Sequence, residues 1–315
     1  MNEAGKKRTP FLFGFDFELS EGFFVENPLN QHNILFDING ITNAPIVKSK
    51  PIQFTFNAFP EAEETYKKRF QSVHRGLLHG DSFLTNLTIK TPVETSFSLH
   101  DIFCSSHAMY KLYIPDKFVC FSPERFVKIE NGKIYSCPMK GTIDGAIPNA
   151  DEVILNDYKE KAEHYTIVDL IRNDLNRVAT EVKVTRFRYI DTLTTHKGFI
   201  LQVSSEIQGT LDSNYKNELG SIILAMLPAG SISGAPKIAT LRIIREAEAE
   251  PRGYYTGIAG YFDGETLDSC VLIRYLEETK KGLFFRSGGG ITINSVCENE
   301  YAEAVEKVYL PFEKI

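Results

Sequence analysis

The chain has 315 residues and a formal net charge of −6, with 43% hydrophobic and 24% charged residues, which is the balance of an ordinary soluble globular protein. The negative charge leaves no basic footprint for nucleic acid, and no apolar run approaches the length of a membrane span. Five scattered cysteines read as reduced thiols and exclude the usual zinc patterns, and the N-terminus lacks the apolar region of a signal peptide, so we expect a cytoplasmic protein with no nucleic-acid or membrane partner.

The first 121 residues predict short strands and two helices. Residues 11–60 are rich in Phe, Ile and Asn with frequent turn residues, which is typical of several strands. Further along, the periodicity predicts a helix over 61–78, a strand over 82–89, a short helix near 98–104 and a strand near 117–121.

The dipeptide Asn131-Gly132 lies between two strand-like runs, which predicts a hairpin with a two-residue turn. Counting outward from this turn pairs Glu130 with Lys133, and Glu124 with Met139. The side chain that follows Met139 would then meet the Glu124 carboxylate at the open end of the hairpin.

That side chain is Lys140. Regular pleating would send Glu124 and Lys140 to opposite faces, so their proximity requires a twist or a bulge near Pro138, which cannot donate to the ladder. On spacing alone, a surface ion pair is the plainer interpretation.

The second half of the chain interleaves helices and strands without regular βαβ spacing, and no linker or repeat divides it. We therefore expect an α+β fold and a single domain over residues 1–315. The predicted elements are a helix over 153–178, strands over 182–187 and 201–208, helices over 219–227 and 237–248, a strand pair over 269–277 and 282–286, and a closing helix over 298–310.

Two pairs of glutamates are candidates for a cation site. Glu160 and Glu163 lie at i and i+3 on one predicted helix, and Glu300 and Glu303 repeat this spacing on the last helix. Like charges at this spacing destabilise a helix, although solvated helix faces often carry them. If the two helices converge, four carboxylates suit Mg²⁺ better than Zn²⁺. Lys307, one turn beyond Glu303, would pair with that glutamate or face an anionic ligand.

Three other segments leave alternatives open. Ser287-Gly288-Gly289-Gly290 could offer backbone N–H groups to a carboxylate or phosphate, although a tight turn is the plainer interpretation. Arg274, within a predicted apolar strand, would face solvent or bind a carboxylate in a bidentate manner. Arg172-Asn173-Asp174 interrupts an apolar helix and is interpreted as a structural hydrogen-bond network.

Taken together, the motifs resemble the chorismate-utilising enzymes: anthranilate and aminodeoxychorismate synthase component I, and the isochorismate and salicylate synthases. The segments SPERF, PMKGT, EHYTIVDLIRNDLNRV, GSISGAPK, RGYYTGIAGYF, IRY, SGGGI and ENEYAE occur in the family's order over roughly residues 75–310. The resemblance implies the anthranilate synthase component I-like fold of packed mixed or antiparallel sheets with outer helices, and Mg²⁺ that holds chorismate. Residues 1–74 are shorter than the corresponding part of full-length relatives, so we expect the tryptophan pocket of many members to be reduced or absent.

The resemblance also implies roles for individual residues. Glu163 and Glu303 are similar to the Mg²⁺ ligands, with Glu160 and Glu300 in support. The implied substrate-binding positions are Gly141 and Thr142 beside the ring, Ser233, Tyr255 and Arg274 at the enolpyruvyl carboxylate, and Gly288, Gly289, Gly290 and Lys307 at the ring carboxylate.

Lys140 decides between branches of the family. PMKGT resembles the PIKGT of aminodeoxychorismate synthases, whereas anthranilate synthases have alanine in place of the lysine. In the lysine branch the amine attacks C2 of chorismate as the 4-hydroxyl leaves, and ammonia then enters at C4 and expels the lysine. Glu124 would be the general acid. We expect the ammonia to come from a separate glutamine amidotransferase subunit, since this chain has no candidate glutaminase segment.

Two further positions bear on the branch. The strand over 83–89 lacks the lysine that isochorismate and salicylate synthases use to activate water, which argues against them. The family strand that carries a histidine reads Leu201-Gln202-Val203-Ser204 here, and Gln202 cannot carry a proton. The alternatives left open are anthranilate synthase component I and a non-catalytic chorismate-binding subunit.

Overall fold

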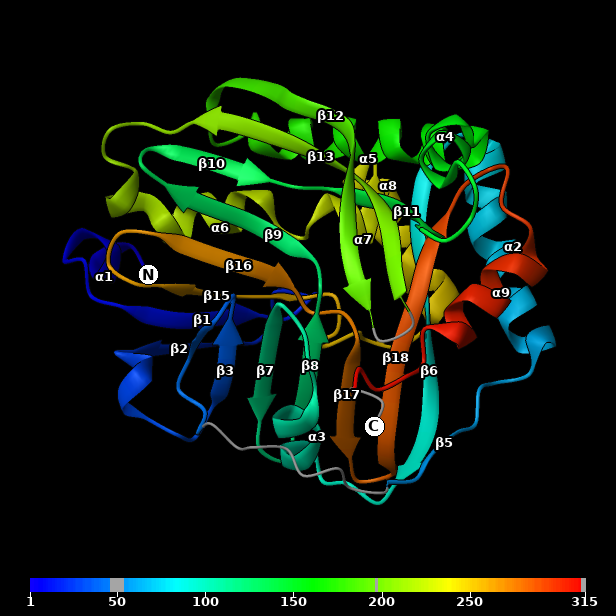
Figure 1. The fold of residues 1–315 in the computed structure, drawn as a ribbon, viewed down its shortest axis with the longest axis horizontal. Helices are drawn as coiled ribbons and strands as arrows, with labels where there is room; N and C mark the ends of the chain where they lie inside the picture. Colours follow the sequence, from blue (N-terminus) through cyan, green and yellow to red (C-terminus); the bar gives the residue numbers. More distant parts are fainter. Residues whose placement is uncertain (46–53, 196–197, 313–315) are drawn as a thin grey trace.

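Two antiparallel sheets of nine strands each form the framework of residues 1–45, 54–195 and 198–312, the parts described by this computed structural model (Figure 1). The first sheet has the order β11 (Met139–Asp144), β13 (Gly198–Thr210), β10 (Lys133–Ser136), β9 (Arg125–Glu130), β16 (Leu267–Val271), β15 (Ile258–Phe262), β1 (Phe11–Phe15) and β2 (Gly22–Glu26), and β12 (Thr180–Thr195) pairs with β13. The second has the order β14 (Gly234–Ala235), β6 (Leu84–Thr95), β18 (Gly282–Ile291), β17 (Tyr275–Thr279), β8 (Phe118–Ser122), β7 (Tyr110–Ile114), β3 (Leu35–Ile38) and β4 (Ile41–Thr42), and β5 (Phe56–Ala58) pairs with β6.

Nine α-helices accompany these sheets in the described ranges: α1 (Asn2–Lys6), α2 (Glu63–His79), α3 (Leu99–Ser105), α4 (Ala150–Asn156), α5 (Tyr158–Leu175), α6 (Leu219–Met226), α7 (Gly230–Ser233), α8 (Lys237–Glu248) and α9 (Cys297–Glu306). Helices α5 to α8 pack on one face of the first sheet, and α2, α8 and α9 pack on β6 and β18. A third cluster lies between the two sheets, and α3 covers the far face of the second sheet. No helix in these ranges is both long and apolar enough to cross a membrane.

The alternation of side chains along a strand explains how the first sheet is buried on both faces. In β1, Phe11 and Phe13 join the cluster that faces the helices, whereas Leu12 points into the cluster between the sheets. Helix α2 buries Tyr66, Phe70 and other residues at helical spacing.

The predicted helix over 237–248 is confirmed at both ends, and α2, α3 and α6 begin and end within two residues of their predicted bounds. The strands β12 and β13 are longer than predicted because they pair along almost their whole lengths, with three register shifts. The helix over 153–178 is wrong in one respect. It is broken at Asp157, whose carboxylate accepts a hydrogen bond from the Glu160 N–H at 2.8 Å and caps α5.

Two other predictions need correction. The strand over 269–277 is two strands, β16 and β17, because the chain crosses from the first sheet to the second between them. Ser287 to Gly290 do not form a tight turn: they continue β18, and each pairs with a residue of β6. Backbone pairing to β6 holds this stretch extended, so the run of glycines leaves a strand without side chains beside the site.

Candidate active site

Lys140 lies on β11, close to where the chain leaves the predicted hairpin. The hairpin turn is confirmed, with Glu130 opposite Lys133. The predicted pairing of Glu124 with Met139 is wrong, because the hairpin ladder extends only to Lys128 and Tyr135 and β11 then pairs with β13.

The bulge that was expected near Pro138 is present. The register between β11 and β13 shifts between Met139 and Thr142, and Gly141 has φ of 82°, a left-handed conformation that favours glycine. The Pro138 carbonyl accepts a hydrogen bond from the Ser205 N–H at 3.0 Å, which ties the start of the bulge to β13.

The amine of Lys140 faces helix α5. Its Nζ lies 3.4 Å from Glu163 Oε2, with the Lys140 side chain 30% exposed and that of Glu163 11% exposed. The next residue, His164, is buried with Nε2 2.7 Å from Ser205 Oγ. Burial, with the positive charges of Arg188 and Lys140, lowers the pKa of His164 to about 4. The imidazole is therefore neutral at physiological pH and adds no positive charge beside the lysine.

Helix α9 brings the second glutamate pair to β18. A Cβ placed on Gly289 would lie 3.6 Å from both Glu300 Oε2 and Glu303 Oε1, and 3.7 Å from Lys307 Nζ. Lys307 Nζ is 2.5 Å from Glu303 Oε1 and donates to the Gly288 carbonyl at 2.9 Å. Of the two roles left open for Lys307, the structure shows the ion pair with Glu303.

The first glutamate pair lies on α5, close to the place where the Lys140 side chain of β11 reaches β18. A Cβ placed on Gly141 would lie 3.0 Å from Glu160 Oε2, and one on Gly290 would lie 4.0 Å from Lys140 Nζ. The edges of β11 and β18 thus face each other, with the two glutamate pairs beside them. Within the described ranges, no group of three or more His, Cys, Asp or Glu side chains is placed to hold a metal ion, and the Mg²⁺ site stays a prediction.

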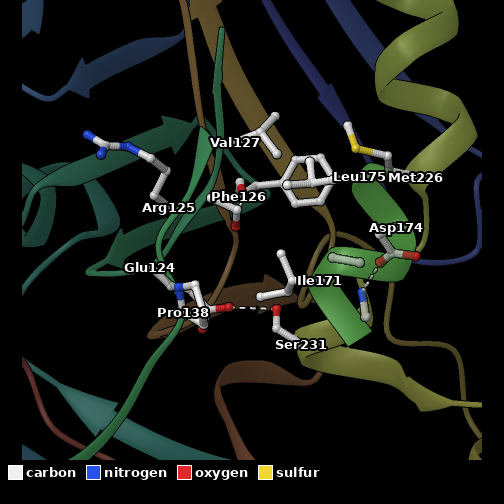
Figure 2. Close-up of a pocket in the computed structure, with 13 residues that line it drawn as sticks. Glu124, Arg125, Phe126, Val127, Pro138, Ile171, Asp174, Leu175, Met226 and Ser231 are labelled. Atoms are coloured by element: carbon white, nitrogen blue, oxygen red, sulfur yellow. Dashed lines mark hydrogen bonds between the residues drawn. The ribbon is translucent and has the colours of Figure 1, made fainter. Parts of the chain in front are cut away.

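Glu124 is the half-buried carboxyl of this region. Its Oε1 accepts a hydrogen bond of 2.6 Å from the Ser231 hydroxyl, drawn as a dashed line in Figure 2. Burial raises the pKa of Glu124, and the Ser231 hydrogen bond and the positive charges of Lys140, Arg274 and Lys307 oppose this shift. The charges of Lys140, Arg274 and Lys307 therefore all act on the Glu124 carboxyl, although Glu124 and Lys140 are not cross-strand partners.

Arg274 lies between β16 and β17 rather than within a strand, with φ of 55°. Its Nε donates to the Tyr309 hydroxyl at 3.4 Å. Tyr255 is buried, and burial raises its pKa to about 12 against the positive charges of Arg252 and Arg274. The sequence placed Tyr255 and Arg274 at one end of the substrate, and the structure brings them into the same neighbourhood.

The other predicted substrate contacts are placed differently. Ser233 is completely buried, and its hydroxyl donates to the Ala229 carbonyl at 2.8 Å. Thr142 is exposed on β11 opposite Gln202. Contact of either residue with substrate stays a prediction.

Three residues that the sequence did not single out as functional hold the region next to Glu124. Ser231 donates to Glu124, Asp174 lines the same small cavity as Glu124, and Lys237 pairs with Asp174, with Nζ 2.5 Å from Oδ1. Asp174 Oδ2 also accepts a hydrogen bond from the Gly230 N–H at 3.0 Å. This bears out the structural network that was inferred for Arg172-Asn173-Asp174, at Asp174. Asp174 and Lys237 lie on two different helices that carry other charged residues as well, so no local sequence signal marks their contact.

Comparison with known proteins places the chain in a family. The family model of the chorismate binding enzymes matches residues 31–312. An uncharacterized PabA-like protein of Haemophilus influenzae is 49% identical over 314 residues, which cover 99% of this chain and 95% of the relative. Aminodeoxychorismate synthase component 1 of Bacillus subtilis is 33% identical over 288 residues, which cover 85% of this chain and 60% of that relative.

The solved structures agree with the sequence comparison. The crystal structure of anthranilate synthase component I from Streptococcus pneumoniae superposes with a TM-score of 0.68 at 27% identity, over 80% of this chain and 58% of that one. This confirms the predicted fold class, with the difference that every strand pairing in the described residues is antiparallel. The chain belongs to the chorismate-binding enzyme family.

Proposed function

We propose that the chain is component I of an aminodeoxychorismate synthase, which aminates chorismate at C4 to 4-amino-4-deoxychorismate. The observation that carries the proposal is the position of Lys140. Its amine lies at the junction of β11 and β18, next to Glu163 and within the electrostatic environment of Glu124. The similarity to the aminodeoxychorismate synthase component 1 of Bacillus subtilis supports it.

In this mechanism Lys140 is the nucleophile and Glu124 is the general acid. The lysine nitrogen forms a bond to C2, both ring double bonds shift by one position, and the C4–O bond breaks while Glu124 protonates the oxygen, which leaves as water. Ammonia then forms a bond to C4, both ring double bonds shift back and the C2–N bond to Lys140 breaks. The ammonia nitrogen loses one proton, so the net reaction exchanges water for ammonia and returns the lysine amine.

Glu124 must carry a proton before the first step. Burial raises the pKa of this carboxyl, which favours the protonated form. Once the proton has gone to the leaving oxygen, the nearby cations Lys140, Arg274 and Lys307 stabilise the carboxylate that remains.

Substrate carboxylates would be held by cations at the two ends of the site. Arg274 and Tyr255 suit the enolpyruvyl carboxylate, because a guanidinium and a phenol can both donate to it. Lys307 already donates to the Gly288 carbonyl, so its remaining N–H groups and the backbone of β18 suit the ring carboxylate.

Mg²⁺ fits the donor set, since carboxylate oxygens are the ligands it prefers and four glutamates border the junction of β11 and β18. Glu163 and Glu303 would hold the ion, with Glu160 and Glu300 in support. When bound, it supplies positive charge that orients the ring carboxylate of chorismate.

We further propose that a glutamine amidotransferase subunit supplies the ammonia. The reaction needs ammonia as such at C4, and the proposed machinery around Lys140 and Glu124 contains no group for hydrolysing glutamine. The chain alone should then use ammonium salts but not glutamine.

The test is mass-resolved product analysis with chorismate, Mg²⁺ and ammonium. The proposal requires a product that has exchanged water for ammonia and has kept the enolpyruvyl group. Release of pyruvate with anthranilate would instead establish the anthranilate synthase alternative. Chorismate binding without turnover would establish a non-catalytic binding subunit.

A further inference from the structure

The segment over 227–237 is tied to the rest of the molecule at several residues. Its anchors come from four different elements or loops, which leaves it little freedom to move as a unit. The Asp174 carboxylate accepts a hydrogen bond from the Gly230 N–H at 3.0 Å, and the Arg252 guanidinium donates to the Ile232 carbonyl at 3.0 Å. The Ser82 hydroxyl and the Phe83 N–H both donate to the Ala235 carbonyl at 2.9 Å. The Lys237 amine donates to the Met226 carbonyl at 2.7 Å.

Within this fixed segment, the Ser231 side chain points at the acid. Figure 2 shows its hydroxyl directed at the Glu124 carboxyl, and both residues line a small cavity of about 20 Å³, which has room for about one water molecule. Asp174 lines the same cavity and holds the adjacent residue, Gly230. The orientation of one hydroxyl therefore depends on an ion pair between two helices, since Asp174 lies on α5 and Lys237 on α8.

We propose that Ser231 is a positioning residue that fixes the Glu124 carboxyl for proton transfer, and that the Asp174–Lys237 ion pair holds Ser231 in place. The inference rests on the proposed role of Glu124 as the general acid. When Glu124 gives its proton to the oxygen leaving C4, the negative charge stays on the carboxylate. The Ser231 hydroxyl already donates to Oε1, so it stabilises that charge without any rearrangement.

The charged groups that act on Glu124 are the cations Lys140 from β11, Arg274 from the chain between β16 and β17, and Lys307 at the end of α9. Arg125 and Asp174 line the same cavity, and none of these five groups is altered by a change at Ser231. A shift in the titration of Glu124 in a Ser231 variant is then caused by the lost hydrogen bond.

The kinetic experiment compares Ser231→Ala and Ser231→Thr with Ser136→Ala. Ser136 is the matched control because it is buried and lines the same cavity, but its hydroxyl donates to the Phe126 carbonyl at 3.0 Å. We expect Ser231→Ala to lower kcat about tenfold with a change in KM below about threefold, and to move the alkaline limb of the pH profile to higher pH. Ser231→Thr should restore both values, and Ser136→Ala should change neither.

A purely structural role would lower kcat without moving the alkaline limb, and that result would overturn the proposal. So would a Ser136→Ala variant whose limb moves as far as that of Ser231→Ala.

A second readout does not depend on turnover. Isotope-edited infrared titration follows the carboxyl C=O band of Glu124, which is assigned by its loss in Glu124→Gln. The band should persist to higher pH in Ser231→Ala than in the wild type, and an unchanged titration overturns the inference. Failure of the proposed function would appear separately, as a wild-type protein that forms no aminated product while the infrared shift is still observed.

Discussion

Lys140 on β11 and Glu163 on α5 contact each other, with Nζ 3.4 Å from Oε2. The contact joins the proposed nucleophile to a proposed metal ligand across a strand and a helix that only α4 separates along the chain. It also orients the lysine away from solvent, since Glu163 is only 11% exposed. The predictions below begin from this pair.

Replacing Lys140 with alanine should abolish amination at C4, because no other amine is proposed to attack C2. We expect aminodeoxychorismate formation to fall by at least about a thousandfold, with some anthranilate-type product remaining. The measurement is product analysis by mass spectrometry with chorismate, Mg²⁺ and ammonium.

Lys140→Arg is the control for charge, since it keeps a cation near Glu163 but cannot act as the nucleophile. It should be as inactive as Lys140→Ala while binding chorismate as the wild type does. Unchanged aminodeoxychorismate formation by either variant would exclude the covalent mechanism.

Glu124→Gln should reduce turnover by about two to four orders of magnitude, as expected for loss of a general acid. It should also change how stability depends on pH. Burial raises the pKa of Glu124 in the folded protein, so between the unfolded and folded values the folded state binds more protons, and wild-type stability falls as pH rises through that window. The stability of Glu124→Gln should not show this fall with pH, because the glutamine side chain does not titrate.

The measurement is urea unfolding of both proteins at several pH values. The stability of Glu124→Gln relative to the wild type should increase with pH. A difference that is constant with pH, or that decreases, would contradict the buried-acid interpretation.

Gly288 and Gly289 should respond differently to alanine although they are neighbours. A Cβ on Gly288 would lie 2.4 Å from the Leu87 carbonyl oxygen, so Gly288→Ala should destabilise the protein by about 1–3 kcal/mol. A Cβ on Gly289 meets its nearest side-chain atoms at 3.6 Å, so Gly289→Ala should fold normally and weaken chorismate binding. Thermal unfolding and calorimetry separate the two effects, and equal loss of stability would contradict the geometry.

Arg252→Met should destabilise the protein strongly. Arg252 and Glu248 form an ion pair with side chains 1% and 3% exposed, and Glu248 also accepts the Thr88 N–H at 2.9 Å. Removing one partner leaves a buried charge without compensation, which costs about 3–5 kcal/mol. Urea unfolding measures the loss. Arg172→Met, which breaks an exposed pair with Asp169, should leave the unfolding midpoint unchanged.

Removing Mg²⁺ with a chelator should abolish activity reversibly. The structure places three glutamates beside the glycines of β11 and β18 and a fourth, Glu163, beside Lys140, and carboxylates without His or Cys select Mg²⁺. Glu163→Gln and Glu303→Gln should each require at least about tenfold more Mg²⁺ for half-maximal chorismate binding, measured by calorimetry. If both variants bound chorismate equally well with and without Mg²⁺, the ligand assignment would be wrong.

Much of the fold was predictable because single segments carry their own signal. The helix over 237–248 begins after Pro236 and keeps its apolar period to the end, so both bounds were predicted correctly. The Asp157 break was missed because the apolar pattern continues across it, and only the cap of α5 reveals it. Ser287 to Gly290 were interpreted as a turn because glycine usually breaks strands, but pairing with β6 overrides that preference.

The site was predictable as a set of residues and not as an arrangement. The glutamate pairs and Lys140 could be selected by residue type and spacing. Their convergence depends on how β11 and β18 meet, and β11 pairs with β13 instead of continuing the hairpin. The contact between Ser231 and Glu124 joins residues 107 apart in sequence, and no local pattern could indicate it.

The break at Asp157 has a consequence for the acidic residues of the site. Because α5 begins at Tyr158 and α9 at Cys297, Glu160 and Glu300 both lie in the first turn of a helix. The exposed N–H groups of a first turn act as a partial positive charge, which offsets the repulsion within each glutamate pair. The acidic cluster is therefore partly neutralised by the backbone before any cation arrives. We expect the protein to fold without Mg²⁺ and to bind and release the ion readily, together with the substrate.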